Sequence, residues 1–385
     1  MSTLPSHALA DAGIKIPALV ARVFAAADIR INGSRPWDMQ VHNPDTFARI
    51  AAQRSLGLGE SYMDGWWECA TLDQFFFRLM THGAAELARS PRMQVLQLLS
   101  HALINRQNHR RAWQVAKTHY DAGNDLFEAM LDETLAYSCG YWKNADGLSQ
   151  AQREKLDLIC RKLQLQPGMR VLDIGCGWGS FVEYAARHYQ AEVTGITVSV
   201  EQARLAQSRC RDLSAEILVQ DYRDVVGRFD RVVSVGMFEH VGRRNYRTFM
   251  DVVNRHLEDN GLFLLHTIGA NRSQHTHDPW INRYIFPNGE LPSLHQLSGA
   301  AEKHFIIEDV HNFGPDYATT LNAWHDKLAP HWGSLAERYD ERFQRMWRYY
   351  LKVCAAAFQA RRIQLWQVVM SKPQACRPRY DAPRP

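Results

Sequence analysis

Nine residues near the middle of the chain could cradle a ligand with their backbone. The segment Val171-Leu-Asp-Ile-Gly-Cys-Gly-Trp-Gly179 is an apolar run that enters three alternating glycines, and a helix is expected from Ser180. Glycines at such a turn adopt positive φ and let a ligand approach the main chain. The spacing is G-x-G-x-G, and no acidic residue closes the next predicted strand, which ends at residues 194–199. This departs from the G-x-G-x-x-G pattern of NAD-binding and FAD-binding folds.

A second group of residues could move a proton. Glu239 and His240 follow the apolar run 231–235, and His266 lies at the end of the next apolar run, 261–267. Ligands bind at the carboxyl edge of open α/β sheets, so neighbouring strands would bring Glu239 and His266 within hydrogen-bonding distance of each other. Such a pair can accept and donate a proton. A carboxylate favoured by a helix N-terminus and a core histidine are the alternatives.

The elements that must hold these residues alternate along the second half of the chain. Strand candidates are separated by helices, which predicts a mostly parallel, seven-stranded α/β sheet with helices on both faces. A long helical stretch, residues 319–360, is expected as an insertion before the last strand. The predicted strands are residues 170–174, 192–197, 216–219, 231–235, 261–267, 305–310 and 363–370.

The 385 residues suggest two or three domains. Residues 1–86 mix short helical and strand-like pieces and predict a small N-terminal α+β domain. Residues 87–117 are predicted as a basic helical linker, because their apolar residues recur at helical spacing. Residues 118–385 are predicted as the catalytic domain.

The composition is that of an ordinary globular protein, with 46% hydrophobic and 22% charged residues, which excludes a disordered or fibrous chain. The seven cysteines form no C-x-x-C pair, so we expect reduced thiols and no metal site. The sequence contains no apolar run of about 18 residues that could span a membrane and no secretory signal. A cytoplasmic location is therefore expected.

The glycine segment resembles the first motif of the class I S-adenosylmethionine-dependent methyltransferases, whose fold is Rossmann-like. In this resemblance Asp173 steadies the loop and the glycines admit the methionine portion of the cofactor. Polar residues after the second and third predicted strands stand where the ribose and the adenine need partners. A turn that serves packing only, an exposed Gln202 and a core Tyr222 are the alternatives. The implied cofactor residues are Asp173, Gly175, Gly177, Trp178, Gly179, Thr197, Ser199, Gln202, Gln220, Asp221 and Tyr222.

Further motifs resemble the bacterial cyclopropane-fatty-acyl-phospholipid synthases over nearly the whole chain. The pieces Tyr137-Ser-Cys139, Phe238-Glu-His240 and Ile285-Phe-Pro-Asn-Gly289 are together more specific than the glycine loop. Residues 55–67 favour the phospholipid synthases over shorter relatives without the N-terminal domain. The other matching segments are residues 120–127, 137–142, 171–179, 236–242, 266–269, 280–293, 311–314 and 364–367.

The resemblance implies transfer of a methylene group from S-adenosylmethionine to the cis double bond of an unsaturated acyl chain in a phospholipid. An alkene is a weak nucleophile, so positioning and the exclusion of water must supply much of the acceleration. Members of the family hold a bicarbonate ion that accepts the proton, and Tyr137 and Ser138 match positions that contact the cofactor. The matching bicarbonate positions are Cys139, Glu239, His266, Tyr317 and the backbone of Ile268.

The resemblance also gives an active-site role to a cysteine that matches Cys354. This thiol stands in the apolar helical run 350–358, where burial would raise its pKa and lower its reactivity, so a core cysteine is the alternative. Cys139 lies in a loop flanked by aromatic residues, and its alternative is also a core thiol. Tyr317 follows a Gly-Pro-Asp turn that could aim its hydroxyl inward or leave it at the surface.

The net charge of +4 hides two cationic stretches. Residues 87–120 hold six basic and no acidic residues, and residues 342–380 hold nine and none, whereas residues 121–341 are acidic overall. With a phospholipid substrate, both stretches are candidates for docking on an anionic bilayer, at roughly 1 kcal/mol per cation. Solvated helix faces are the alternative. The docking candidates are Arg106, Arg110, Arg111, Lys117, Arg342, Arg345, Arg348, Arg361 and Arg362.

These expectations describe a cytoplasmic enzyme that associates reversibly with the inner membrane surface and, by the resemblance, forms a homodimer. A methyltransferase that leaves a methyl branch on a lipid, or that acts on a small molecule, is the alternative function. A non-catalytic module that binds lipid or nucleic acid is a third possibility. The motif Asn-Pro-Pro-Tyr, typical of base methylation, is missing after the fourth predicted strand, so no nucleic acid partner is expected.

Overall fold

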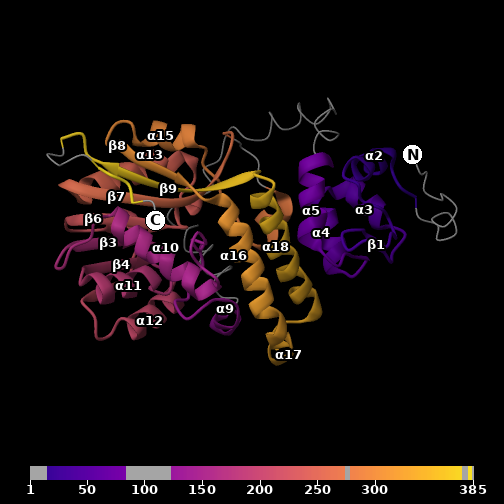
Figure 1. The fold of residues 1–385 in the computed structure, drawn as a ribbon, viewed down its shortest axis with the longest axis horizontal. Coiled ribbons are helices and arrows are strands. Elements are labelled where there is room, and N and C mark those ends of the chain that lie inside the picture. Colours follow the sequence, from indigo (N-terminus) through magenta and orange to yellow (C-terminus); the bar gives the residue numbers. More distant parts are fainter. Residues whose placement is uncertain (1–14, 84–122, 274–277, 375–379, 384–385) are drawn as a thin grey trace. The chain divides into compact units, whose positions relative to one another are not determined.

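A computed structural model describes residues 15–83, 123–273, 278–374 and 380–383 (Figure 1). The predicted linker, residues 87–117, lies outside these ranges. The chain divides into two compact units. The first comprises residues 1–103, 276–287 and 330–362, and the second comprises residues 104–275, 288–329 and 363–385.

The first unit combines short helices with one small antiparallel sheet, as expected for an α+β domain. The sheet pairs β1, Gln40–Val41, with β2, Trp67–Glu68. The helices are α2 (Ala18–Ala26), α3 (Thr46–Gln53), α4 (Ser55–Met63), α5 (Leu72–Arg78), the π-helical turn η1 (Leu79–Gly83), α14 (Pro279–Tyr284), α17 (Trp332–Leu335) and α18 (Glu341–Gln359).

The membership of α18 differs from the predicted division, which assigned residues 118–385 to one domain. This helix packs against α4 and α5 of the first unit. The ring of Tyr349 lies 5.7 Å from Tyr62 and 5.0 Å from Phe76, and all three side chains are buried. A stripe of large apolar side chains on α18 therefore completes the core of the first unit, although this helix is far in sequence from α4 and α5.

The cationic stretch that begins at residue 342 is also used inside the first unit. Arg342 pairs with Asp64 at 2.8 Å, and Arg345 pairs with Glu68 and donates to the carbonyl of Tyr62. Arg348 and Arg362 donate to the carbonyls of Ala70 and Met80. These arginines thus bind the N-terminal segment. The sequence had suggested either lipid docking or a solvated helix face, and neither interpretation includes such contacts.

The second unit contains the expected seven-stranded sheet, in the order β5-β4-β3-β6-β7-β9-β8. Neighbouring strands from β5 to β7 are parallel, and β9 is antiparallel to both β7 and β8. The strands are β3 (Arg170–Ile174), β4 (Glu192–Thr197), β5 (Ala215–Val219), β6 (Phe229–Val235), β7 (Leu257–Ala270), β8 (Ile306–Asn312) and β9 (Ile363–Ser371). Every predicted strand is present.

Helices cover both faces of this sheet, because the side chains of its central strands alternate between two apolar clusters. Leu264 of β7 joins a cluster with α10 (Leu148–Lys162), α11 (Ser180–Tyr189) and α12 (Val200–Arg209), while Leu265 joins a cluster with α13 (Tyr246–His256) and α15 (Leu294–Ala301). Central strands buried on both faces read as continuous apolar runs, which made them easy to predict. Figure 1 shows the sheet between these two groups of helices.

Two further helices, α9 (Asn124–Met130) and α16 (Gly314–Leu328), pack against each other in the second unit. Within the described ranges, the structure has no helix that is long and apolar enough to cross a bilayer.

Candidate active site

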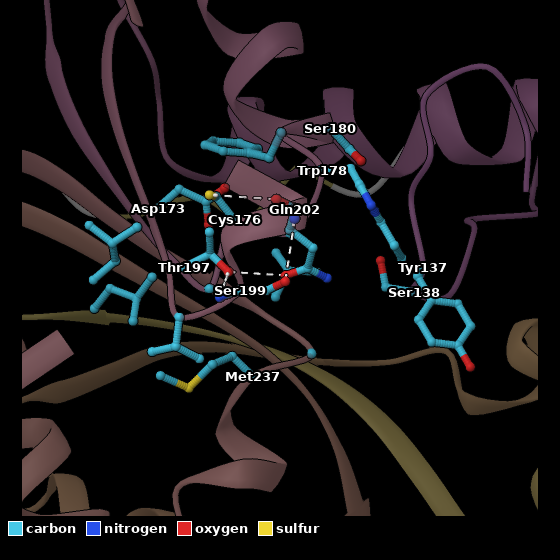
Figure 2. A pocket seen from close by; sticks show the side chains of 18 of the residues that line it. Tyr137, Ser138, Asp173, Cys176, Trp178, Ser180, Thr197, Ser199, Gln202 and Met237 are labelled. Carbon is cyan, nitrogen blue, oxygen red and sulfur yellow. Dashed lines mark hydrogen bonds between the residues drawn. The ribbon is translucent and has the colours of Figure 1, made fainter. Parts of the chain in front are cut away.

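A pocket opens at the carboxyl ends of β3, β4, β5 and β6 (Figure 2). Twelve of the thirteen predicted cofactor residues line it, and Gly179 is the exception. Figure 2 shows Tyr137 and Ser138 on one side of the pocket and Thr197 with Met237 on another. The lining residues from the prediction are Tyr137, Ser138, Asp173, Gly175, Gly177, Trp178, Thr197, Ser199, Gln202, Gln220, Asp221 and Tyr222.

The glycine loop has the backbone geometry that its sequence predicts. Gly175, Gly177 and Gly179 have φ values of 85°, 56° and 82°. The N–H groups of Gly175 and Cys176 both donate to the carbonyl of Ile196 at 2.9 Å, which anchors the loop to the end of β4. A Cβ atom added to Gly175 would lie 2.7 Å from Cβ of Met237. Gly175 thus needs both its positive φ and its missing side chain.

The polar residues after β4 form a connected group. The hydroxyl of Thr197 donates to Oε1 of Gln202 at 3.0 Å. The side chain of Ser199 caps α12 by accepting from the N–H of Gln202 at 3.3 Å. All three residues are buried, so the alternative of an exposed Gln202 is wrong. Figure 2 shows the group along one wall of the pocket.

The residues after β5 serve the core and the pocket together. Asp221 is buried and accepts from the N–H of Arg223 at 3.0 Å. The ring of Tyr222 packs against Phe249 at 5.3 Å within the apolar cluster that includes α13, and it also lines the pocket. Tyr222 therefore fits both interpretations offered by its sequence.

Glu239 lies just after β6, and His266 lies within β7, paired with Val235 at the end of β6. Both are buried, but they do not bond to each other. Oε1 of Glu239 accepts from the N–H of Ile268 at 2.6 Å, and Nδ1 of His266 lies 3.3 Å from Nε2 of Gln367. The predicted hydrogen bond between the two is therefore wrong, because each has a nearer partner. Both Oε2 of Glu239 and Nε2 of His266 are buried, and neither has a hydrogen-bond partner among the described residues.

Burial perturbs both of these groups in the direction that opposes charge. Desolvation raises the pKa of Glu239 to about 7, against the opposing effect of the Ile268 hydrogen bond. Desolvation lowers the pKa of His266, and the positive charges of Lys155 and Lys162 lower it further. Titratable groups shifted in this way are typical of functional sites.

Cys139 is fully buried, and one threonine ties its loop to α16. Oγ1 of Thr320 accepts from the N–H of Gly140 at 3.1 Å and from Nε1 of Trp142 at 2.8 Å, and donates to the carbonyl of Asp316. It also lies 3.9 Å from the sulfur of Cys139. Burial raises the pKa of Cys139 well above its usual value, so the thiol is neutral.

Tyr317 lies on the first turn of α16, where it is buried with its ring 6.0 Å from that of Trp324. A surface position for Tyr317 is therefore wrong. Cys354 lies on α18 of the first unit, whereas the other predicted site residues belong to the second. Desolvation raises the pKa of Cys354 to about 12, as expected for an unreactive structural thiol.

Sequence reasoning missed Lys155, which lines the pocket and is almost completely buried. Its Nζ donates to the hydroxyl of Ser138 at 2.9 Å. The available signal was its register on α10, where it shares the buried face with Gln152, Leu156 and Ile159. A lysine within such a face is uncommon unless it has a partner.

This sheet and its pocket define the class I methyltransferase fold. The same fold occurs in coclaurine N-methyltransferase bound to N-methylheliamine and SAH, at a TM-score of 0.66 and 19% identity over 84% of this chain and all of that one.

Residues 107–368 match the family described as mycolic acid cyclopropane synthetase. The chain belongs to this family. It is 55% identical to the cyclopropane-fatty-acyl-phospholipid synthase of Escherichia coli (strain K12) over 91% of this chain and 92% of that protein. Mycolic acid cyclopropane synthase CmaA1, solved in complex with SAH and CTAB, has a TM-score of 0.63 and 33% identity over 69% of this chain and 99% of that one.

Proposed function

We propose that this protein transfers a methylene group from S-adenosylmethionine to the cis double bond of unsaturated acyl chains in phospholipids, forming cyclopropane fatty acyl chains. The observation that carries the proposal is the 55% identity to the Escherichia coli synthase, which extends over 92% of that protein. The identity is not confined to the glycine loop that all such methyltransferases share.

The pocket fits S-adenosylmethionine by its chemistry. Its glycines expose the main chain, its buried Thr197, Ser199 and Gln202 offer hydroxyl and amide groups, and Trp178 and Met237 supply apolar walls. When bound, the cofactor supplies an electrophilic methyl group. The chain's own contribution is to hold the acceptor alkene in position and to exclude water, since an alkene attacks only weakly.

The residues around Glu239 fit a small anion such as bicarbonate. A buried carboxyl with a pKa of about 7 is partly protonated near neutral pH and can donate a hydrogen bond through Oε2, which bonds to none of the residues that the structure describes. Nε2 of His266 offers a second open position. We infer that Cys139, Glu239, His266, Tyr317 and the main chain of Ile268 hold the ion. When bound, bicarbonate would supply a base for the proton that the newly added methyl group must lose.

The acyl chains that react belong to a bilayer, so the proposal includes reversible docking on an anionic membrane surface and, by the family resemblance, a homodimer. Four of the predicted docking arginines, at positions 342, 345, 348 and 362, already bond within the first unit. This favours residues 87–120, with six basic and no acidic residues, as the docking stretch. The candidates Arg106, Arg110, Arg111 and Lys117 lie outside the described residues.

The activity is tested by incubating the protein with S-adenosylmethionine and vesicles of a monounsaturated phospholipid, followed by mass spectrometry of the acyl chains. A gain of one CH2 with loss of the double bond is expected. A gain of one CH2 with an alkene retained would instead indicate a methyl-branching enzyme. Vesicles of the saturated phospholipid are the control and should not react.

Docking is tested separately, by sedimenting the protein with anionic vesicles at increasing salt concentration. Binding through the cationic stretch should weaken as salt screens the charges. Binding that does not depend on salt would contradict an electrostatic docking surface.

A further inference from the structure

We propose that Lys155 is a positioning residue for the methyl donor, because it fixes Ser138 at the wall of the pocket. The inference rests on the proposed use of S-adenosylmethionine and assigns a task to a side chain that the glycine-loop motif does not include.

The first observation is that α10 forms two hydrogen bonds with the loop that contains Ser138. Gln152 donates through Nε2 to the carbonyl of Ser138 at 2.8 Å, and Lys155, one turn further, donates to the hydroxyl of Ser138 at 2.9 Å. Both side chains are buried. The position of Ser138, and that of its neighbour Tyr137, is thereby set by α10 rather than by the loop alone.

The second observation is that Lys155 has more hydrogen-bond donors than partners. An ammonium has three N–H groups. Among the described residues its one hydrogen-bond partner is Ser138. Leaving a buried charge poorly bonded costs folding free energy, so a site that retains one has a use for it.

The third observation is a buried carboxyl group that lines the same pocket as Lys155. Asp173, near the end of β3, is buried and lines the pocket, and in the described part of the chain its Oδ1 has no hydrogen-bond partner. Desolvation lowers the pKa of Lys155 to about 8, and the carboxylates of Asp132 and Asp173 oppose that shift. Desolvation raises the pKa of Asp173 to about 7, and Lys155 opposes it. Lys155 therefore also supplies the compensating charge for the motif carboxylate.

The chain contains a matched control on the same helix. Lys162 is also completely buried on α10, but its Nζ contacts Asp309 at 3.1 Å and His311 at 3.1 Å, and it does not line the pocket. Replacing either lysine by methionine removes one buried ammonium and keeps a similar side-chain length. Lys162→Met also removes the charge that pairs with Asp309, so it should lose at least as much folding stability as Lys155→Met, but only Lys155→Met should lose cofactor affinity.

The test is calorimetric titration of the full chain with S-adenosylhomocysteine, which needs no turnover. We expect Lys155→Met to raise the Kd about tenfold, the loss of one charged hydrogen bond. Its KM for S-adenosylmethionine should rise by a similar factor while kcat changes little. Lys162→Met should stay within about twofold of the wild type. An unchanged Kd in Lys155→Met, or an equal loss in both variants, would overturn the proposal.

A second variant covers the case in which Lys155→Met does not fold. Ser138→Ala removes the acceptor and leaves every charge in place, so it should also weaken binding of S-adenosylhomocysteine. Wild-type affinity in Ser138→Ala would refute a role for Lys155 that acts through Ser138. Failure of the wild-type protein to bind S-adenosylhomocysteine at all would instead refute the proposed function.

Discussion

The two parts of the proposed active site differ in how far the protein satisfies its own polar groups. In the pocket wall after β4, Thr197, Ser199 and Gln202 are bonded to one another. Just after β6 and within β7, Glu239 and His266 each keep one buried polar atom that no other described residue bonds. Buried polar groups are normally bonded, so the exceptions call for an explanation. The first region is bonded within the protein, whereas the second leaves two buried polar atoms for the anion that we propose.

The strongest test of this difference is Glu239→Gln. We expect turnover to fall by about 10² to 10⁴, the usual contribution of a proton-handling group. The Kd for S-adenosylhomocysteine should change by less than about twofold, since Glu239 is not among the residues that line the pocket. Turnover by mass spectrometry and affinity by calorimetry check the two parts. Wild-type turnover would remove Glu239 from the proposed site.

The same substitution should stabilise the protein at alkaline pH. The unfolded carboxyl ionises near its ordinary pKa of 4.5, but the folded one ionises only near 7. Between these values the unfolded state releases a proton that the folded state retains, so stability falls as pH rises. Glu239→Gln removes this penalty and should be more stable than the wild type at pH 8, by roughly 1–3 kcal/mol. The difference should vanish near pH 4 in denaturant titrations.

In the pocket, Gly175→Ala should lower both the affinity for S-adenosylhomocysteine and the stability, unlike Glu239→Gln. The added Cβ would lie 2.7 Å from Met237 at a φ of 85°. We expect at least about tenfold weaker binding of S-adenosylhomocysteine and a loss of roughly 1–3 kcal/mol in stability. Gly177→Ala is the matched control, because its Cβ would meet nothing within 4 Å, although its φ is also positive. Equal losses of affinity and stability in both variants would show that the positive φ, and not the contact with Met237, causes them.

A smaller loss of stability and turnover is expected at Thr320, which ties the Cys139 loop to α16. Thr320→Val keeps the shape but leaves two buried donors, the N–H of Gly140 and Nε1 of Trp142, without their acceptor. A stability loss of about 1–3 kcal/mol is expected, with turnover lowered several-fold because the Cys139 loop loosens. Thr320→Ser should restore both properties. Denaturant unfolding and the vesicle assay provide the measurements.

The smallest effect is expected for Cys354→Ser in the first unit. With its pKa raised to about 12, the thiol is neutral and unreactive at physiological pH. The variant should retain more than about half of the turnover, with a modest loss of stability from a polar atom at a packed position. Complete inactivity of a folded Cys354→Ser protein would restore Cys354 to the active site.

The sequence predicted the sheet and the pocket because their signals are local. Each central strand is a short apolar run, and most of the predicted pocket residues lie at or just after the end of such a run, so the sheet edge brings them together. Tyr137 and Ser138, which lie in a loop before α10, were predicted from the family resemblance alone. The partners of Glu239 and His266 were not predictable in this way. The main-chain N–H of Ile268 donates to the carboxylate of Glu239. The side chain of Gln367, which lies on β9 about a hundred residues after His266, contacts the imidazole of His266.

Two further differences have the same origin. Arg342 and Arg345 look like surface cations in the sequence, but their partners, Asp64 and Glu68, lie far away near the N-terminus. Lys155 looks like a solvated helix residue until its partner Ser138 is known. Long-range pairing of charges leaves no local pattern, so net charge along the sequence overestimates the free cationic surface.

The threading of the chain has a consequence for its synthesis. The first unit takes its last segment, residues 330–362, before the second unit receives β9, which then inserts between β7 and β8. The first unit can therefore be finished first, whereas the second, although most of it is synthesised earlier, must wait for β9. Until residues 363–371 arrive, β7 and β8 each present an open edge to other chains. Premature termination just before Ile363 should therefore yield an aggregating product rather than a partly active enzyme.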